Sequence, residues 1–168
     1  MTLKRAFPPV ADANTRVLIL GSLPGEMSLA AGRYYAHPQN ALWRLVGHVL
    51  DEDIAGLAYE ARLERLLARG VGLWDTIETA RREGSLDSAI KNAEARDLKA
   101  LTATLPSLRA LGFNGGTSTR IGMKAMAGSD LALIGLPSSS PAYAAMRFEQ
   151  TFPEKPAVGL NAYWAADF

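Results

Sequence analysis

The chain of 168 residues contains no cysteine and only two histidines, His37 and His48. The lack of cysteine excludes thiol nucleophiles, disulfides and cysteine-ligated metals, and two histidines are too few for a histidine-rich metal site. No apolar run reaches the roughly 18 residues that a membrane span needs. Residues 1–5 are not followed by the long apolar stretch of a signal peptide. We therefore expect a cytoplasmic protein that has no membrane partner.

Sequence motifs of several large enzyme classes are missing as well. The chain has no Gly-x-Ser-x-Gly nucleophile elbow and no Gly-x-x-x-x-Gly-Lys-Ser/Thr phosphate loop. The spacing Gly21-x-x-x-Gly25 does not match a dinucleotide-binding fingerprint. A small-molecule α/β hydrolase would also need a nucleophile–base pair, and none is visible in the sequence. The net charge of +1 neither favours nor excludes a nucleic-acid partner.

Short apolar runs alternate with helical patterns along the chain. The runs are continuous, as in strands buried on both faces of a parallel sheet, and the segments between them carry apolar residues at helical spacing. We predict strands at Val17–Leu20, Val71–Trp74, Leu108–Phe113 and Leu131–Leu136, helices at Ala41–Leu50, Leu57–Ala68, Leu98–Leu105 and Thr117–Ala127, and a partly helical segment at Ala142–Phe168. This alternation predicts an α/β fold, with one domain over residues 1–168 in three α/β/α layers around a central, mostly parallel four-stranded sheet.

The predicted strands lead into loops that are rich in polar residues. These loops are Gly21–Gly25, Trp74-Asp75, Phe113–Gly116 and Pro137–Pro141. Because ligands of open α/β sheets bind at the carboxyl ends of the strands, the loops should gather around one site. The polar and aromatic segment Tyr34–Asn40 should lie beside that site.

Several pieces of sequence at these positions, in this order, resemble one family. They are Gly21–Gly25 with Ser28, Tyr34–Asn40 with Trp43, Gly72–Asp75, Arg82–Ile90, Phe113–Gly115 and Leu136–Pro141. The chain thereby resembles the uracil-DNA glycosylase superfamily over most of its length, and within it the hypoxanthine-DNA (deoxyinosine) glycosylase branch. The pattern His-Pro-x-Asn followed by an aromatic residue is also shared with the mismatch-specific uracil/thymine branch.

The resemblance implies a monofunctional base-excision enzyme that needs neither metal nor cofactor. Such an enzyme binds DNA containing deaminated bases, flips the damaged nucleotide into a pocket and hydrolyses the bond between base and sugar. The protein must hold the leaving base, stabilise developing charge and aim a water at the sugar carbon. We expect hypoxanthine as the first substrate and uracil as the second, with the protein acting as a monomer.

Asn40 and Ser22 are the candidate catalytic residues under this resemblance. Asn40 matches the catalytic asparagine of the hypoxanthine branch and would orient water or bond the leaving base, although it also stands where a helix N-cap belongs. Ser22 occupies the position where the uracil-specific branch carries an acidic water activator and the mismatch branch an asparagine, and a serine cannot replace that carboxylate as a base. The segment Gly84–Ile90 matches the branch closely, and we expect it to support the pocket.

Tyr35, Asp75 and Asn114 are the candidate base-binding residues. Tyr35 aligns with the aromatic that stacks on the flipped base, and its alternative role is core packing. Asp75 aligns with a residue that reads the base edge, where a carboxylate would accept from N1–H of hypoxanthine or donate if protonated. Its alternative role is a helix cap. Asn114 would contact the base or form a turn before two glycines.

Ser138, Ser139, Ser140 and Tyr143 are the candidate DNA-binding residues. The serines match the superfamily's second motif, which grips the phosphate backbone, and Tyr143 falls near the wedge that fills the space left by the flipped base. Hydroxyl and backbone N–H groups at the start of a helix suit phosphate binding, while Ser140 followed by Pro141 is equally a good helix cap.

Two alternatives remain open within the resemblance. One is an enzyme specific for G·U and G·T mismatches. The other is a superfamily member that binds nucleic acid or a nucleotide without cleaving it. Abasic sites that depend on Asn40 would distinguish an enzyme from the second alternative.

Overall fold

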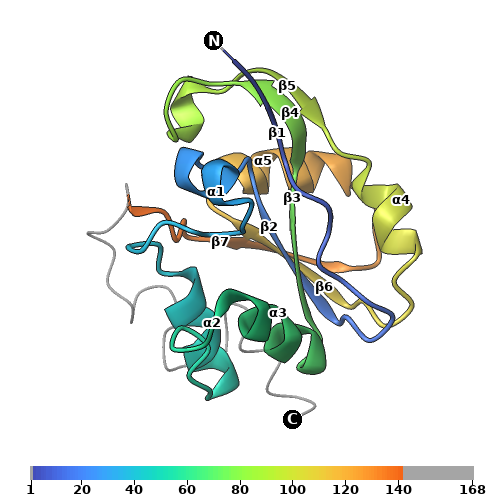
Figure 1. The fold of residues 1–168 in the computed structure, drawn as a ribbon. Coiled ribbons are helices and arrows are strands. Elements are labelled where there is room, and N and C mark those ends of the chain that lie inside the picture. The colour runs from blue at the N-terminus through green and yellow to red at the C-terminus, as the bar shows by residue number, and fades with distance from the viewer. Residues whose placement is uncertain (1, 142–168) are drawn as a thin grey trace.

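The structure, a computed structural model, describes residues 2–141 and arranges them around two β-sheets (Figure 1). The helices are α1 (Glu26–Ala31), α2 (Leu42–Leu50), α3 (Tyr59–Ala68), α4 (Leu98–Ala103) and α5 (Gly116–Ala125), with a short 3-10 helix η1 (Asp87–Ala89). The strands are β1 (Leu3–Arg5), β2 (Val17–Gly21), β3 (Val71–Asp75), β4 (Ile77–Arg81), β5 (Lys91–Ala95), β6 (Ala110–Asn114) and β7 (Ala132–Leu136). The segment expected to be partly helical, and with it Tyr143, lies outside the described residues.

The central sheet has the strand order β3-β2-β6-β7, and all of its pairings are parallel. β2 pairs with β3 from Val17 opposite Val71 to Gly21 opposite Asp75. β6 ends against β7 with Asn114 opposite Leu136. This four-stranded sheet with helices on both sides confirms the predicted α/β class and its three layers.

The side chains of β2 explain why the helices divide into two layers. Val17 and Ile19 pack in a core cluster with residues of α2 and α3, whereas Leu18 and Leu20 pack in a second cluster with residues of α4. Successive side chains of a strand point to opposite faces, so a continuous apolar run buries both faces of the sheet at once. Figure 1 shows α2 and α3 on one side of the sheet and α1, α4 and α5 on the other.

A second sheet, with the antiparallel order β1-β4-β5, was not predicted from the sequence. Only Thr76 separates the end of β3 from the start of β4, so the chain passes directly from the central sheet into this smaller one. Every residue of β5 is exposed, and its sequence Lys-Asn-Ala-Glu-Ala lacks the apolar alternation that marks a strand. The segment Arg82–Ile90 connects β4 to β5 and is therefore held at both ends by the second sheet.

The ends of the elements differ modestly from the prediction. The helix predicted from Leu57 begins at Tyr59, and the short helix α1 was not expected at all. Asp97 does cap α4, since its side chain accepts a hydrogen bond from the backbone of Ala100 at 3.0 Å. Gly70 follows α3 with φ +76°, a backbone conformation that suits glycine after a helix. In the described part of the chain, no helix has the length and apolar character needed to cross a membrane.

Gly122 provides a test of the packing between α5 and β6. A Cβ placed there would lie 2.0 Å from the Phe113 ring, whereas one at Gly116, on the same helix, would meet nothing within 4 Å. Gly122→Ala should therefore lower the free energy of unfolding by about 1–3 kcal/mol through overpacking. Gly116→Ala, the matched control, should leave it unchanged or raise it by up to about 1 kcal/mol. Urea unfolding measures both, and equal effects would contradict this account of the helix–sheet contact.

Candidate active site

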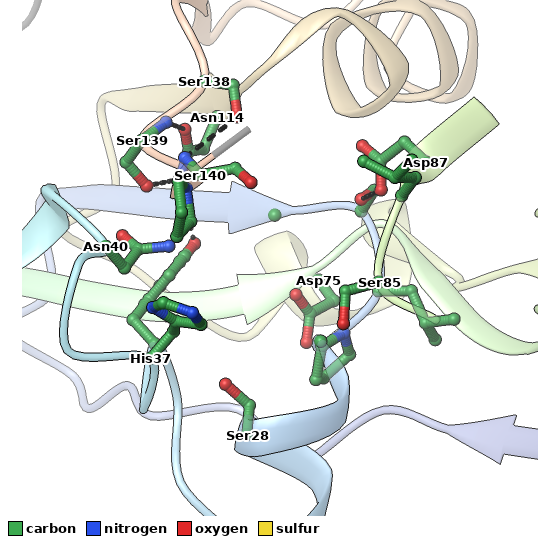
Figure 2. Close-up of a pocket in the computed structure, with 18 of the residues that line it drawn as sticks. Ser28, His37, Asn40, Asp75, Ser85, Asp87, Asn114, Ser138, Ser139 and Ser140 are labelled. Carbon is green, nitrogen blue, oxygen red and sulfur yellow. Dashed lines mark hydrogen bonds between the residues drawn. The ribbon is translucent and has the colours of Figure 1, made fainter. Parts of the chain in front are cut away.

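A pocket of about 560 Å³ lies at the carboxyl ends of the central strands. Its lining comes from the ends of β2, β3 and β6, from the loops after β2 and β7, from α1 and the start of α5, and from residues of the segments 34–40 and 85–88. The structure places on it every predicted site residue within the described part of the chain, namely Ser22, Tyr35, Asn40, Asp75, Asn114, Ser138, Ser139 and Ser140. Figure 2 shows that the side chains of Asn40, Asp75, Asn114 and the three serines come from different elements to one hollow.

The side chain of Asn40 is held in one orientation at the start of α2. Its Oδ1 accepts a hydrogen bond from the backbone N–H of Leu42 at 3.0 Å. The N-cap residue of α2 is Ala41, so Asn40 lies one position before the cap that the sequence suggested and contacts the first residue of the helix. Because Oδ1 is engaged with the helix, the NH₂ group is the part of the amide left for a ligand. In Figure 2 this nitrogen is turned toward the middle of the pocket. Oδ1 of Asn40 thus contacts the helix, and the NH₂ group of the same side chain faces the pocket.

Tyr35 combines a constrained backbone with a well-packed ring. Its φ of +51° lies in the left-handed region, which a non-glycine residue rarely adopts. Its carbonyl accepts from Trp43 Nε1 at 3.0 Å, and its ring meets the Trp43 ring edge to face, with centroids 6.2 Å apart. Burial raises the pKa of the Tyr35 hydroxyl, so the group stays neutral. The ring therefore packs in the core and borders the pocket at once.

Asn114 uses its amide to connect the end of β6 to the loop after β7. Its Oδ1 accepts from the backbone N–H of Ser139 at 2.9 Å, and its Nδ2 donates to Ser139 Oγ at 2.8 Å. A longer contact of 3.4 Å runs from Nδ2 to the Tyr35 hydroxyl. The turn itself is made by Gly115, whose φ is +98°, rather than by Asn114. Asn114 thus braces the pocket wall.

The three serines of the loop 138–140 differ in their surroundings. Ser139 is buried, and its carbonyl accepts from the backbone N–H of Ala41, which ties the loop to the start of α2. Ser138 Oγ accepts from the backbone N–H of Ser140 at 3.1 Å, and both residues are half-buried at the pocket. The helix that Ser140 and Pro141 were expected to start would lie beyond the described residues.

Asp75 is a buried carboxyl group at the end of β3. Only 3% of the residue is exposed, and Oδ2 has no hydrogen-bond partner among the described residues. Burial raises the pKa of Asp75 to about 7, and the nearby charge of Asp87 adds to this while Arg96 and Arg82 oppose it. The alternative role as a helix cap is wrong, because β4 follows directly. The carboxyl can therefore switch between donor and acceptor near neutral pH.

Gly21 makes room for this group. A Cβ at position 21 would lie 2.8 Å from Asp75 Oδ1 and 3.1 Å from the Tyr35 hydroxyl. Both distances are shorter than ordinary contacts, so any side chain there would displace one of the two groups. The lack of a side chain at Gly21 therefore lets the Tyr35 hydroxyl and the Asp75 carboxyl both approach the end of β2.

Asp87 is the residue at the pocket that the sequence analysis did not single out. The segment Gly84–Ile90 was expected only to support the pocket, but Ser85, Leu86, Asp87 and Ser88 all line it. Asp87 Oδ1 accepts a hydrogen bond from the buried Ser22 hydroxyl at 2.7 Å. The two residues are 65 positions apart, and no spacing rule links them. The only available signal was that this segment belongs to the family pattern.

His37 orders the segment that leads to Asn40. Its Nδ1 accepts from the backbone N–H of Gln39 at 3.1 Å, and its carbonyl accepts from the backbone N–H of Asn40 at 2.9 Å. Within residues 2–141 there is no group of three or more histidine, aspartate and glutamate side chains arranged to hold a metal ion.

Comparison with known proteins agrees with this geometry. A family model described as the Uracil DNA glycosylase superfamily matches residues 8–164. The chain belongs to this superfamily. A glycosylase-superfamily protein of Methanosarcina acetivorans, named as a candidate uracil DNA glycosylase and solved by NMR, superposes with a TM-score of 0.78. It is 38% identical, and the match covers 99% of this chain and 96% of the other.

Two curated relatives carry the name hypoxanthine DNA glycosylase. The one from Methanosarcina barkeri is 45% identical over 112 residues, which is 67% of this chain and 71% of the relative. The one from Methanosarcina acetivorans is 46% identical over 113 residues, with 67% and 72% covered. The resemblance inferred from the sequence pieces is thereby confirmed at the level of the superfamily.

The raised pKa of Asp75 makes the stability of this superfamily member depend on pH. Between about 4, the ordinary pKa of an aspartate, and about 7, the folded state binds more protons than the unfolded state. The free energy of unfolding should therefore fall as the pH rises through this window, by at most about 1.4 kcal/mol per pH unit from this group, and become level above it.

Asp75→Asn isolates that contribution, because the amide has no proton to lose. The stability of this variant relative to the native protein should increase as the pH rises from 4 to 7, measured by urea unfolding at several pH values. Asp130→Asn, which changes an exposed aspartate, serves as the control and should show no such trend. A difference between Asp75→Asn and the native protein that is constant across pH would contradict the assignment.

Proposed function

We propose that the protein is a monofunctional DNA glycosylase that removes hypoxanthine, and less readily uracil, from DNA. The prediction of a DNA glycosylase acting on deaminated bases is confirmed at the level of the family and its named relatives. The proposal adds the preferred base and the roles of individual residues. One observation supports it above all: a buried carboxyl with an unpartnered oxygen lies in the same pocket as an amide whose oxygen is held by the first residue of α2.

Asp75 matches the chemical feature that deamination creates. Replacing an exocyclic amino group by a carbonyl gives hypoxanthine and uracil the same edge, a ring N–H beside a C=O. An ionised Asp75 would accept from that N–H, and a protonated Asp75 would both donate to the carbonyl and accept from the N–H. In adenine and cytosine, the corresponding ring nitrogen is an acceptor, so an ionised carboxylate would repel it. Asp75 lines the pocket, and its buried Oδ2 has no hydrogen-bond partner among the described residues.

Tyr35 and Asn40 would also act on the flipped nucleotide. The Tyr35 ring, fixed by Trp43, would stack on the base, a contact that contributes about 1–3 kcal/mol per base in single-strand complexes. The NH₂ group of Asn40 would donate to the departing base or to the attacking water. Since Oδ1 is held by Leu42 N–H, the donor is pre-positioned and costs little reorganisation during the reaction.

The loop 138–140 would bind the DNA backbone beside the flipped nucleotide. Ser138 and Ser140 are half-buried at the pocket, and hydroxyl groups of this kind contact phosphate oxygens. Ser139 and Asn114 would keep the loop in place through their paired hydrogen bonds. Tyr143 would act next to this loop as part of the wedge. We propose that the protein works as a monomer in the cytoplasm.

A single-turnover assay on labelled oligonucleotides tests this function. Hypoxanthine or uracil would be placed in single strands and duplexes, and alkali-labile abasic sites would be quantified. We expect product from both bases, fastest with hypoxanthine. Asn40→Ser retains an oxygen that can accept from the backbone N–H of Leu42 but removes the NH₂ donor, so it should fold, bind DNA and cleave at least about 100-fold more slowly.

Gln39→Ala provides the matched control for Asn40. Gln39 is the exposed amide next to Asn40 and does not line the pocket, so its loss should leave the rate unchanged. Full activity of Asn40→Ser would show that the NH₂ group of Asn40 is not needed and that the residue only holds the start of α2. Binding without abasic sites from the native protein would instead favour a superfamily member that binds DNA without cleaving it, and a strict need for a G·U or G·T mismatch would favour the mismatch-specific branch.

A further inference from the structure

Asp87 brings a carboxylate to a part of the pocket that the roles proposed above leave unused. It opens η1 in the segment between β4 and β5, and its carboxylate lies against Ser22 at the end of β2. Figure 2 shows Asp87 and Asp75 on one side of the pocket and Asn40 on the other. The pocket thus contains two carboxyl groups in different settings: Asp75 is buried, whereas the side chain of Asp87 is 36% exposed.

Several contacts hold the segment of Asp87 onto the loop that follows β2. The buried guanidinium of Arg82 donates to the carbonyls of Leu23 and Pro24 on that loop and, at 3.0 Å, to the carbonyl of Gly84 on its own segment. Ser85 Oγ accepts from the backbone N–H of Glu26 at 2.9 Å. The two segments therefore form one rigid wall, although they come from different sheets.

The lysine of β1 adds a third attachment. Lys4 Nζ donates to the Gly84 carbonyl at 2.7 Å and forms an ion pair with Glu26 at 3.4 Å. Lys4 and Arg82 thus both bind Gly84, three residues before Asp87. A carboxylate on a segment anchored in this way has little freedom to leave the pocket.

The contacts of Asp87 distinguish its two oxygen atoms. Oδ1 accepts from Ser22 at 2.7 Å and lies 3.7 Å from Nη1 of Arg82. A role of Asp87 as counter-ion of the buried Arg82 explains the position of Oδ1, but it requires no contact from Oδ2. Oδ2 makes none of these contacts and belongs to a side chain that is partly open to the pocket. This second oxygen is placed to bind a water molecule.

We propose that Asp87 is the catalytic carboxylate that orients and deprotonates the attacking water in base excision, with Ser22 as its positioning residue. This inference rests on the proposed glycosylase function. A serine in the loop after β2 cannot act as a base, and Asp87 supplies the carboxylate to that loop from a distant part of the chain. Leu23, the next residue of the loop, is apolar and buried. The proposed general base, Asp87, and the residue that positions it, Ser22, thus come from two different loops.

The step balances as a simple hydrolysis. The bond between C1′ of the sugar and the ring nitrogen of the base breaks, and its electron pair leaves with the base. The water oxygen forms a new bond to C1′, while one water proton passes to Oδ2 of Asp87. That proton then returns through solvent to the departed base. Asp75 and Asn40 hold the base, and Asp87 faces the water.

Asp87→Asn tests the inference because it removes the base while keeping an oxygen that can accept from Ser22. The single-turnover rate on hypoxanthine DNA should fall by at least about 100-fold, the usual contribution of a general base. DNA affinity, measured by fluorescence anisotropy, should stay within about threefold of the native value. Glu83→Gln makes the same chemical change at an exposed residue of the same segment, outside the pocket, and should leave the rate unchanged.

A second variant separates catalysis from the charge balance of Arg82. Asp87→Ala leaves space for a small carboxylate, so added formate should raise the single-turnover rate of this variant at least about tenfold. Ser22→Ala should slow the reaction less than Asp87→Asn does. A native rate in Asp87→Asn, or an Asp87→Ala protein that loses DNA binding and shows no rescue by formate, would overturn the role of Asp87 and leave the glycosylase function standing. If the native protein itself forms no abasic sites, the proposed function fails, and this inference fails with it.

Discussion

β2 lies between β3 and β6 with both of its faces buried, and the parallel pairing on each side brings the neighbouring strand ends to one edge of the sheet. Gly21, Asp75 and Asn114 each end one of these strands. Their mutual distances follow from the register of the sheet rather than from local loop preferences. The pocket inherits its geometry from the hydrophobic run that buries β2, which is why polar residues far apart in the sequence can face a single ligand.

The two sides of the pocket differ in charge. Asn40, Asn114 and the serines of the loop 138–140 offer neutral donors and acceptors, whereas Asp75 and Asp87 place two acids on the other side. The buried guanidinium of Arg82 lies behind Asp87 and partly offsets the negative charge. A polyanionic DNA backbone would meet the neutral side, while developing positive charge on a sugar would be stabilised by the acidic side. The asymmetry suits a reaction with a cationic transition state.

Much of the fold could be predicted because β2, β3, β6 and β7 are apolar runs whose burial decides their structure. The pocket residues Asn40 and Asp75 could be placed for the same reason, since they directly follow or adjoin predictable elements. The second sheet escaped prediction because β5 is wholly exposed and owes its strand conformation to pairing with β4. Asp87 escaped because its contact with Ser22 depends on the path of β4 out of the central sheet. Long-range placement of this kind has no local sequence signal.

The lining of the pocket comes from two sheets that differ in exposure, because the segment Arg82–Ile90 connects two strands of the smaller sheet. β2, β3 and β6 are mostly buried, whereas β5 is exposed along its length and its pairing with β4 contains register shifts. The edge strand β5 is exposed and pairs irregularly, so amide hydrogen exchange should be faster there than in the central sheet. Because Arg82 and Lys4 attach the segment between β4 and β5 to the loop after β2 and to α1, this local opening would stay at the outer edge of the smaller sheet and leave Asp87 at the pocket.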